Sequence, residues 1–189
     1  MNCNQRITVR ARRLMERSER IRHGVRACVL GQVLVAATER GVCVVEFGDD
    51  AGALEASLRR RFSEAEFAGT DATFDGWVGR VLDGIALPRA AFELPLDIRG
   101  TAFQQTVWAA LRAIPPGDTA SYREVAERIG RPGAARAVAR ACASNALALL
   151  VPCHRVVRED GGLGGYRWGI ERKNTLLQKE QQSEGYKPT

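Results

Sequence analysis

Three short segments rich in β-branched residues constrain the fold of the first half of the chain most strongly. They span residues 25–30, 33–38 and 42–47. Gly31-Gln32 separates the first two, and Glu39-Arg40-Gly41 separates the last two. Segments of this composition joined by such short turns favour antiparallel pairing. The sequence therefore predicts an antiparallel meander.

A helical periodicity follows these segments. Leu54, Leu58 and Phe62 recur every four residues, which places them on one face of a helix. Gly48-Asp49-Asp50 precedes them and can end the sheet and cap that helix. A second helix is predicted around residues 74–82. A sheet with two helices is a small α/β domain.

The second half is predicted to be mostly helical. Thr101-x-x-Gln104 and Ser121-x-x-Glu124 are capping-box patterns, which mark helix starts. A third helix, over residues 134–143, follows the turn Arg131-Pro132-Gly133. Two short helices joined by a turn of about four residues are typical of a helix-turn-helix. A last helix is predicted from about Ile170 to Lys179.

These patterns predict a fold of two parts, α/β followed by α. The first is a small N-terminal α/β domain, an antiparallel sheet with helices, and the second is a mostly helical C-terminal domain that contains the helix-turn-helix. A proline-punctuated linker with a short edge strand, residues 87–97, joins them. The predicted divisions are a basic flexible arm (1–22), the α/β domain (23–95), the helical domain (96–181) and a loose tail (182–189).

The net charge of +6 is unevenly distributed. Residues 1–26 carry eight arginines against two glutamates, and residues 27–99 carry seven basic against twelve acidic residues. Residues 100–189 carry thirteen basic against eight acidic residues. Positive fields of this kind attract polyanions, although many solvated surfaces are equally basic. Charge alone does not identify DNA as a partner.

Cysteine usage and hydropathy exclude other classes. The chain has five cysteines at irregular spacing, which argues against a disulfide framework and favours reduced thiols in the cytoplasm. No apolar run approaches the ~18 residues of a membrane span, and the start lacks the apolar core of a secretory signal. His23, Cys3, Cys28 and Cys43 contain no tight ligand pair, so no metal site is predicted.

The predicted helix over residues 134–143 has an unusual composition. It is mostly alanine, with Arg136 and Arg140 four residues apart. Alanine is the best helix former, so propensity and tight packing can explain it. As a DNA-binding helix it would lie close against a narrow groove, because it has few side chains that read bases in the major groove. This composition predicts weak sequence preference.

The stretch from Leu149 to Val157 holds the residue best suited to chemistry. Its apolar run stops at Pro152, presents Cys153 followed by His154, and returns to β-branched residues. The pattern predicts a strand or extended segment that holds Cys153 in a fixed place. A neighbouring base or positive charge favours the reactive thiolate, and His154 and Arg155 can supply these. A buried structural cysteine is the alternative.

Further motifs surround this stretch. They are Leu94–Gln105, Ala120–Ala126, Arg136-Ala137-Val138, Ser144-Asn145, Gly164–Gly169 and Glu171-Arg172-Lys173. Together with Pro152-Cys153-His154-Arg155-Val156, they resemble the O6-alkylguanine-DNA alkyltransferase family of suicide DNA-repair proteins. The resemblance covers most of the chain and is greatest to the C-terminal half of the bacterial adaptive-response protein Ada. The separate regulatory half of that protein finds no counterpart here.

The resemblance implies a reaction and its catalytic residues. The Cys153 thiolate would take the alkyl group from O6-alkylguanine, and from O4-alkylthymine, in one irreversible turnover without a cofactor. His154 would take the thiol proton through a water molecule, and Glu171 would orient His154. Asn145 would shape the turn before the active-site segment, although by itself it could be an ordinary helix C-cap.

The resemblance also implies how DNA is held. Tyr122 would help to rotate the damaged nucleotide out of the duplex and Arg136 would fill the gap, although alone both would be taken for surface residues. The other residues assigned to the DNA-facing helix are Ala134, Ala135 and Arg140. The residues assigned to the base pocket are Pro152, Val156, Val157, Tyr166 and Trp168, with Trp168 narrowing it.

The expected partner is double-stranded DNA carrying O6-alkylguanine, bound by a cytoplasmic monomer without a membrane or an obligatory protein partner. Three alternatives remain. A non-catalytic recognition protein is disfavoured because such proteins lack cysteine at the position of Cys153. A helix-turn-helix regulator is disfavoured by the poor base-reading content of residues 134–143. A cysteine hydrolase is disfavoured because adjacent Cys and His rarely meet in hydrolase geometry.

Overall fold

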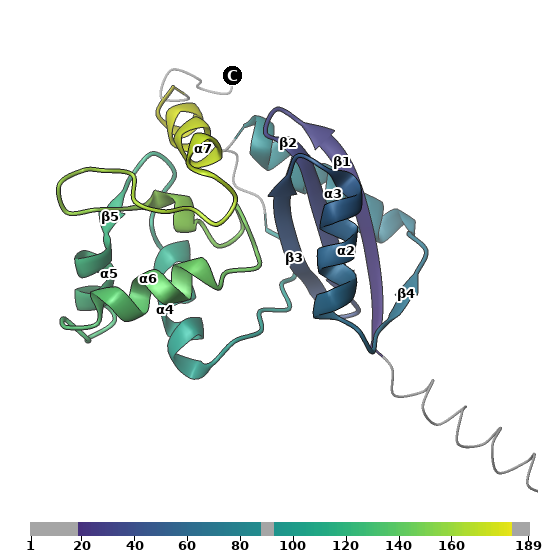
Figure 1. Cartoon of the computed structure of the whole chain (residues 1–189), viewed down its shortest axis with the longest axis horizontal. Helices are drawn as coiled ribbons and strands as arrows, with labels where there is room; N and C mark the ends of the chain where they lie inside the picture. Colours follow the sequence, from purple (N-terminus) through teal and green to yellow (C-terminus); the bar gives the residue numbers. More distant parts are fainter. Residues whose placement is uncertain (1–18, 88–92, 183–189) are drawn as a thin grey trace, which may run out of the picture.

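The structure is a computed structural model that describes residues 19–87 and 93–182 (Figure 1). Most of the predicted basic arm and nearly all of the predicted tail lie outside the described residues. Within the described residues the chain forms an N-terminal sheet with helices and a mostly helical C-terminal part. This confirms the predicted fold class.

The N-terminal sheet contains the predicted meander. β1 (Arg20–Cys28), β2 (Gly31–Thr38) and β3 (Gly41–Gly48) pair antiparallel in chain order. β1 begins at Arg20, within the range predicted for the basic arm (1–22), so residues 20–22 belong to the sheet. A short fourth strand that was not predicted, β4 (Glu66–Ala68), pairs parallel with β1 and gives the order β3-β2-β1-β4.

Two helices accompany this sheet. α2 (Ala51–Arg61) is capped by Asp50, and α3 (Ala72–Ala86) is capped by Asp71, whose carboxylate accepts a hydrogen bond from the Phe74 N–H at 2.9 Å. Leu54 and Leu58 of α2 pack on one set of sheet residues. The apolar face of α3 packs on the other set, in a core that continues into the C-terminal part. The sheet therefore lies between α2 and the rest of the molecule.

The C-terminal part contains the predicted helices. They are α4 (Ala102–Arg112), α5 (Tyr122–Arg128), α6 (Ala135–Ala143) and α7 (Ile170–Gln182). Both predicted capping boxes form, at Thr101 and at Ser121. α5 and α6 make the helix-turn-helix, and the Trp108 indole of α4 holds α6 by donating to the Ala141 carbonyl at 2.9 Å.

The segment before Cys153 is not the predicted strand. Leu149 has a positive φ of 67°, and the chain turns before a 3-10 turn, η1 (Cys153–Arg155). Only β6 (Val156–Val157) is extended, and it pairs with β5 (Ala120–Ser121). The cause is local hydrogen bonding, because the Val151 carbonyl accepts from the Asn145 side chain at 2.8 Å and Pro152 has no N–H for a strand ladder.

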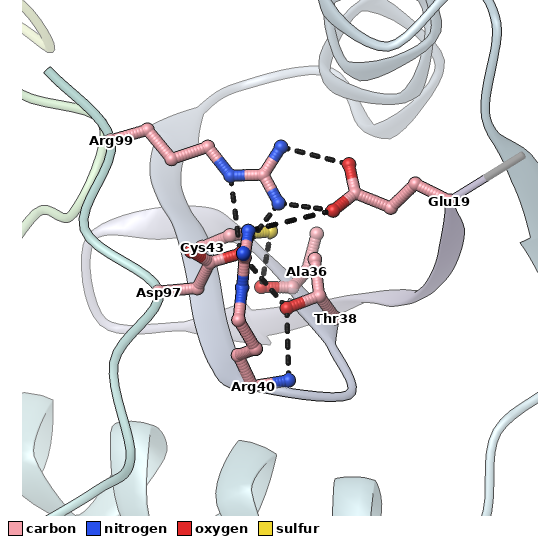
Figure 2. A network of polar contacts seen from close by, with 7 residues as sticks. All are labelled: Glu19, Ala36, Thr38, Arg40, Cys43, Asp97 and Arg99. Atoms are coloured by element: carbon pink, nitrogen blue, oxygen red, sulfur yellow. Dashed lines mark hydrogen bonds and ion pairs between the residues drawn. The ribbon is translucent and has the colours of Figure 1, made fainter. Parts of the chain in front are cut away.

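A polar network fastens the linker to the sheet (Figure 2). The Asp97 carboxylate accepts hydrogen bonds from Thr38 Oγ1 at 2.9 Å, Arg40 Nη2 at 3.0 Å and Arg99 Nε at 3.1 Å. Arg99 also pairs with Glu19, just before β1. Burial opposes ionisation of Asp97, but the hydrogen bonds from Arg99, Arg40 and Thr38 outweigh it, so its pKa is lowered.

The lowered pKa of Asp97 predicts an acid-sensitive contribution to stability. Because the folded state favours the ionised carboxylate, the contribution is present above the unfolded pKa of about 3.9 and is lost as the pH falls through the folded pKa. Asp97→Asn should lower the free energy of unfolding at pH 7 by about 2 kcal/mol. Thermal unfolding of both proteins from neutral to acid pH tests this, and a gap independent of pH would contradict it.

Candidate active site

Cys153 opens η1 and is buried, with 5% of its surface exposed. Its Sγ accepts a hydrogen bond from Asn145 Nδ2 at 3.2 Å. Burial raises the pKa of Cys153 to about 11, against the opposing effects of this hydrogen bond and of the charges on Lys173 and Arg167. At neutral pH the group is therefore a thiol, and its use as a nucleophile requires a base that takes the proton.

His154 has the chemistry of that base. Its ring is fully buried, and Nε2 lies 2.8 Å from Oε1 of Glu180. Burial lowers the pKa of His154 despite the nearby Glu180 carboxylate, so the imidazole is neutral at pH 7. An ionised carboxylate only accepts hydrogen bonds, so Nε2 carries the proton and Nδ1 has the free lone pair. Nδ1 is buried and has no hydrogen-bond partner among the described residues.

Glu180 is held firmly in its ionised form. Burial opposes ionisation, but hydrogen bonds from His154 and Arg155 lower the pKa of Glu180 to about 2. Arg155 Nε lies 3.1 Å from both carboxylate oxygens, and the Gly117 N–H donates to Oε2 at 3.1 Å. Arg155 also donates to the Ile114 carbonyl. The carboxylate is thus fixed while it orients the imidazole.

The orienting role was assigned to the wrong glutamate. Glu171 is exposed in the first turn of α7, whereas Glu180 is buried in its last turns. Nine residues at about 100° each place the two on opposite faces of the helix. The signal was present in the sequence, because Lys173, Leu176, Leu177 and Glu180 follow the i, i+3, i+4, i+7 spacing of a buried face.

Sequence reasoning also missed Lys173. This side chain is fully buried, and its ammonium group donates to the carbonyls of Val156 and Leu163. Burial lowers the pKa of Lys173, opposed by the nearby Cys153. Lys173 thus joins the segment after Cys153 to the glycine-rich loop of residues 161–165, and its charge favours the Cys153 thiolate.

Asn145 lies directly after α6 and closes the turn that precedes Cys153. Its Oδ1 accepts from the Leu147 N–H at 2.8 Å, and its Nδ2 donates to the Val151 carbonyl and to Cys153 Sγ. Its backbone N–H donates to the Cys142 carbonyl. Asn145 therefore fixes the end of the helix-turn-helix and the reactive sulfur together.

The residues assigned to the DNA-facing helix lie on α6 and at the start of α5. Arg136 and Arg140 are exposed, while Ala134 and Ala135 are half-buried at the N-terminal end of α6. Tyr122 is half-buried, and a Cβ added at Gly164 would lie 3.2 Å from its hydroxyl. Tyr122 therefore packs against the glycine-rich loop. Among the described residues, none of these side chains forms a hydrogen bond with Cys153 or His154.

Of the residues assigned to the pocket, Val156 and Trp168 share an apolar core with Cys153, and Tyr166 packs against that core. Pro152 and Val156 are buried, Val157 is half-buried, and Trp168 is buried with its ring packed edge-on against Tyr166 and Phe47, at centroid distances of 5.1 and 6.3 Å. The Tyr166 hydroxyl is buried and has no hydrogen-bond partner among the described residues. Burial raises its pKa well above the usual value, so it remains a neutral donor.

No helix in the described part of the chain is long and apolar enough to cross a membrane. Among residues 19–87 and 93–182, no group of three or more His, Cys, Asp or Glu side chains could hold a metal ion.

Comparisons with known proteins identify relatives of this chain. Residues 102–182 match the model of the 6-O-methylguanine DNA methyltransferase DNA-binding domain. The chain is 50% identical over 164 residues to the bifunctional transcriptional activator/DNA repair enzyme Ada of Escherichia coli, covering 87% of this chain and 46% of that protein. It is 50% identical over 108 residues to a methylated-DNA–protein-cysteine methyltransferase of Mycobacterium bovis, covering 57% of this chain and 66% of that protein.

A solved structure resembles the whole described fold. The Mycobacterium tuberculosis OGT in complex with DNA superposes with a TM-score of 0.70 at 35% identity, covering 86% of this chain and 93% of that one. The chain spans about half the length of the Ada proteins that it matches. With a buried cysteine, a neutral histidine and a helix-turn-helix in this arrangement, the chain belongs to the 6-O-methylguanine DNA methyltransferase family.

Proposed function

We propose that the chain repairs DNA by direct reversal, transferring a methyl or other alkyl group from O6 of guanine to Cys153. The observation that carries this proposal is the buried set of Cys153, His154 and Glu180. In this set, Asn145 holds the nucleophile Cys153, and His154 supplies a neutral imidazole. The free nitrogen of that imidazole, Nδ1, has no hydrogen-bond partner among the described residues. This is the nucleophile, base and orienting group of a triad.

The chemistry is a displacement at the alkyl carbon. Cys153 Sγ attacks that carbon as the bond from carbon to O6 breaks, and the bonding electrons stay on the guanine. His154 Nδ1 accepts the thiol proton, directly or through a water molecule, and this proton balances the one that the guanine ring gains. The product is a stable thioether, and none of the described residues could remove the alkyl group from it, so each molecule acts once without a cofactor.

The DNA partner follows from the helix-turn-helix. The O6-alkyl group belongs to a base stacked in the duplex, where a buried thiol cannot reach it, so the damaged base must leave the stack at a cost of a few kcal/mol. In our proposal α6 lies in the minor groove through its alanine face, Arg136 fills the gap, Arg140 contacts phosphate, and Tyr122 contacts the turned-out nucleotide. The exposure of both arginines and the half-buried position of Tyr122 support these roles.

The finer parts of the proposal concern substrate range and setting. We infer that O4-alkylthymine is a second substrate, since it presents an alkylated exocyclic oxygen to the same pocket. We also infer that the protein acts as a cytoplasmic monomer without a protein partner, because the described residues supply nucleophile, base and orienting group from one chain. Lesion recognition without transfer is the competing function, and Cys153 disfavours it.

Nucleoside analysis of treated DNA tests the proposed function. A duplex with one O6-methylguanine, titrated with the protein, should lose one lesion per protein molecule and then stop. Restored guanine in that ratio supports single-turnover repair. Repair that continues beyond one lesion per molecule, or excision of the base, would contradict it.

Trp168 predicts a limit on alkyl-group size. Its ring packs on Tyr166 and Phe47, and in our proposal it narrows the pocket that receives the alkyl group. Free O6-benzylguanine should therefore inactivate the protein slowly compared with methyl transfer from DNA, and Trp168→Ala should speed inactivation while costing about 3–5 kcal/mol of stability. Residual transfer activity after incubation with the free base measures this. Rapid inactivation of the unmodified protein would exclude the limit.

A further inference from the structure

The N-terminal sheet makes direct backbone contact with the active-site turn. The Val45 N–H of β3 donates to the Ala146 carbonyl at 2.8 Å, and the Ala148 N–H donates to the Val45 carbonyl at 2.9 Å. This short parallel bridge pairs Val45 with Leu147. The turn that follows Asn145 is therefore joined to the edge of the sheet at β3 by an isolated β-bridge.

The next residue of β3, Glu46, reaches the same turn through its side chain. Glu46 is buried, with 4% of its surface exposed, and its Oε1 accepts from Arg167 Nη2 at 3.0 Å and lies 3.3 Å from Arg61 Nη2. Arg167 Nη1 in turn donates to the Asn145 carbonyl at 3.2 Å. One guanidinium group thus joins a buried carboxylate of the N-terminal part to the backbone of Asn145.

Every polar group of Asn145 takes part in a hydrogen bond. Its backbone N–H, carbonyl, Oδ1 and Nδ2 all take part in hydrogen bonds, and Nδ2 contacts Cys153 Sγ. A planar guanidinium fixed at both ends restrains the group that it holds more tightly than a single contact does. The position of the Asn145 carbonyl is therefore linked to the direction of its side chain toward the sulfur.

We propose that Glu46 and Arg167 are positioning residues for Cys153, which act through Asn145 and make the N-terminal sheet part of the alkyl-transfer machinery. The proposal rests on the proposed alkyl transfer at Cys153. Reacting groups must be held within about 0.5 Å of the productive geometry, and small misplacements cost large factors in rate. Glu46 touches neither the thiol nor the base, so its effect on the rate passes through Arg167 and Asn145.

The experiment compares three variants by single-turnover methyl transfer at saturating duplex that contains O6-methylguanine. Glu46→Ala removes the acceptor for Arg167, Glu46→Gln keeps an oxygen in its place, and Arg99→Ala is the matched control. Arg99 also ties the N-terminal part to the linker, through Asp97 and Glu19, but among the described residues it forms no hydrogen bond with Asn145 (Figure 2). Arg61 and Arg167 are each about one-third exposed, so Glu46→Ala leaves no fully buried charge unpaired.

The expected result separates positioning from stability. Glu46→Ala should slow transfer on the order of 10-fold, Glu46→Gln should recover most of the rate, and Arg99→Ala should lower the melting temperature while leaving the rate of the folded protein unchanged. Affinity for lesion DNA should be the same in Cys153→Ser and in the double variant that also carries Glu46→Ala.

The pH dependence of the transfer rate provides a second test, because a purely structural role of Glu46 would leave it unchanged. A weaker Asn145 contact should raise the pKa of Cys153, so the pH–rate midpoint of Glu46→Ala should shift upward. Several other groups act on this thiol and stay in place in the variant: Lys173, Cys142, Tyr122, Tyr166 and the His154–Glu180 pair.

Each outcome decides between the two proposals. If the unmodified protein gains no methyl group, the proposed function fails and the positioning proposal fails with it. If the unmodified protein transfers the group, a Glu46→Ala rate and pH profile equal to those of the unmodified protein overturn the positioning proposal alone. An equal loss of rate in Arg99→Ala and Glu46→Ala also overturns it, because the effect would then be general loosening between the two parts.

Discussion

Glu180→Gln should slow methyl transfer by a factor of about 100 or more, whereas Glu171→Gln should leave the rate unchanged. Glu180 keeps the Nε2 proton of His154 in place and stabilises the positive charge that develops when Nδ1 accepts the thiol proton. A neutral amide provides neither effect fully, and losses of general-base assistance are typically 10²–10⁴-fold. Single-turnover rates of the two variants measure this directly.

Glu180→Gln also removes the buried counter-charge of Arg155, so a control must separate this effect from the loss of the orienting carboxylate. Glu180→Asp retains the charge on a shorter side chain and should fold with an intermediate rate. Thermal unfolding identifies the pH and temperature at which each variant is folded, and rates are compared there. Equal losses in the variants of Glu171 and Glu180, which lie on opposite faces of α7, would contradict the assigned roles.

Cys153→Ser should abolish transfer while lesion binding remains. The hydroxyl is a much weaker nucleophile than the thiolate, and a neutral imidazole cannot ionise it to a useful extent. The smaller oxygen can still accept from Asn145 Nδ2, so the turn and the helix-turn-helix should be retained. Gel-shift affinity for O6-methylguanine DNA should be close to that of the unmodified protein, and lost binding together with lost transfer would show that Cys153 is needed for the fold.

The parts of the fold that carry a local signal could be predicted from the sequence. The meander follows from β-branched segments with two short turns, and α4 and α5 follow from capping boxes that form as expected. β4 has only three residues and no periodic pattern, and it exists because it pairs with the distant β1. Its stability comes from tertiary contact, which local propensity does not report.

The sequence suggests the proposed nucleophile and base, and the family resemblance adds Asn145, but the other supporting residues could not be predicted. Cys153 and His154 stand next to each other in the chain, so their residue types suffice to suggest the pair. Glu180 lies 26 positions after His154, and only the face of α7 on which it lies brings it close. The roles of Glu46 and Lys173 likewise depend on contacts across the fold. The sequence alone does not show whether a charged residue is buried or exposed to solvent.

The conformation around Cys153 also could not be predicted from local sequence propensity. The apolar run with valines favours a strand by propensity, but the Asn145 side chain takes the Val151 carbonyl and Leu149 adopts a positive φ. These hydrogen bonds produce a turn and then η1, which contains both Cys153 and His154. A side chain that competes for backbone hydrogen bonds overrides the local preference for extended structure.

Intact-protein mass after incubation with a duplex carrying one O6-methylguanine tests the central claim most directly. The account predicts a gain of one methyl group per chain, mapped to the peptide that contains Cys153, and no gain in Cys153→Ser. An unchanged mass with tight binding of the lesion would contradict alkyl transfer and identify a recognition protein instead.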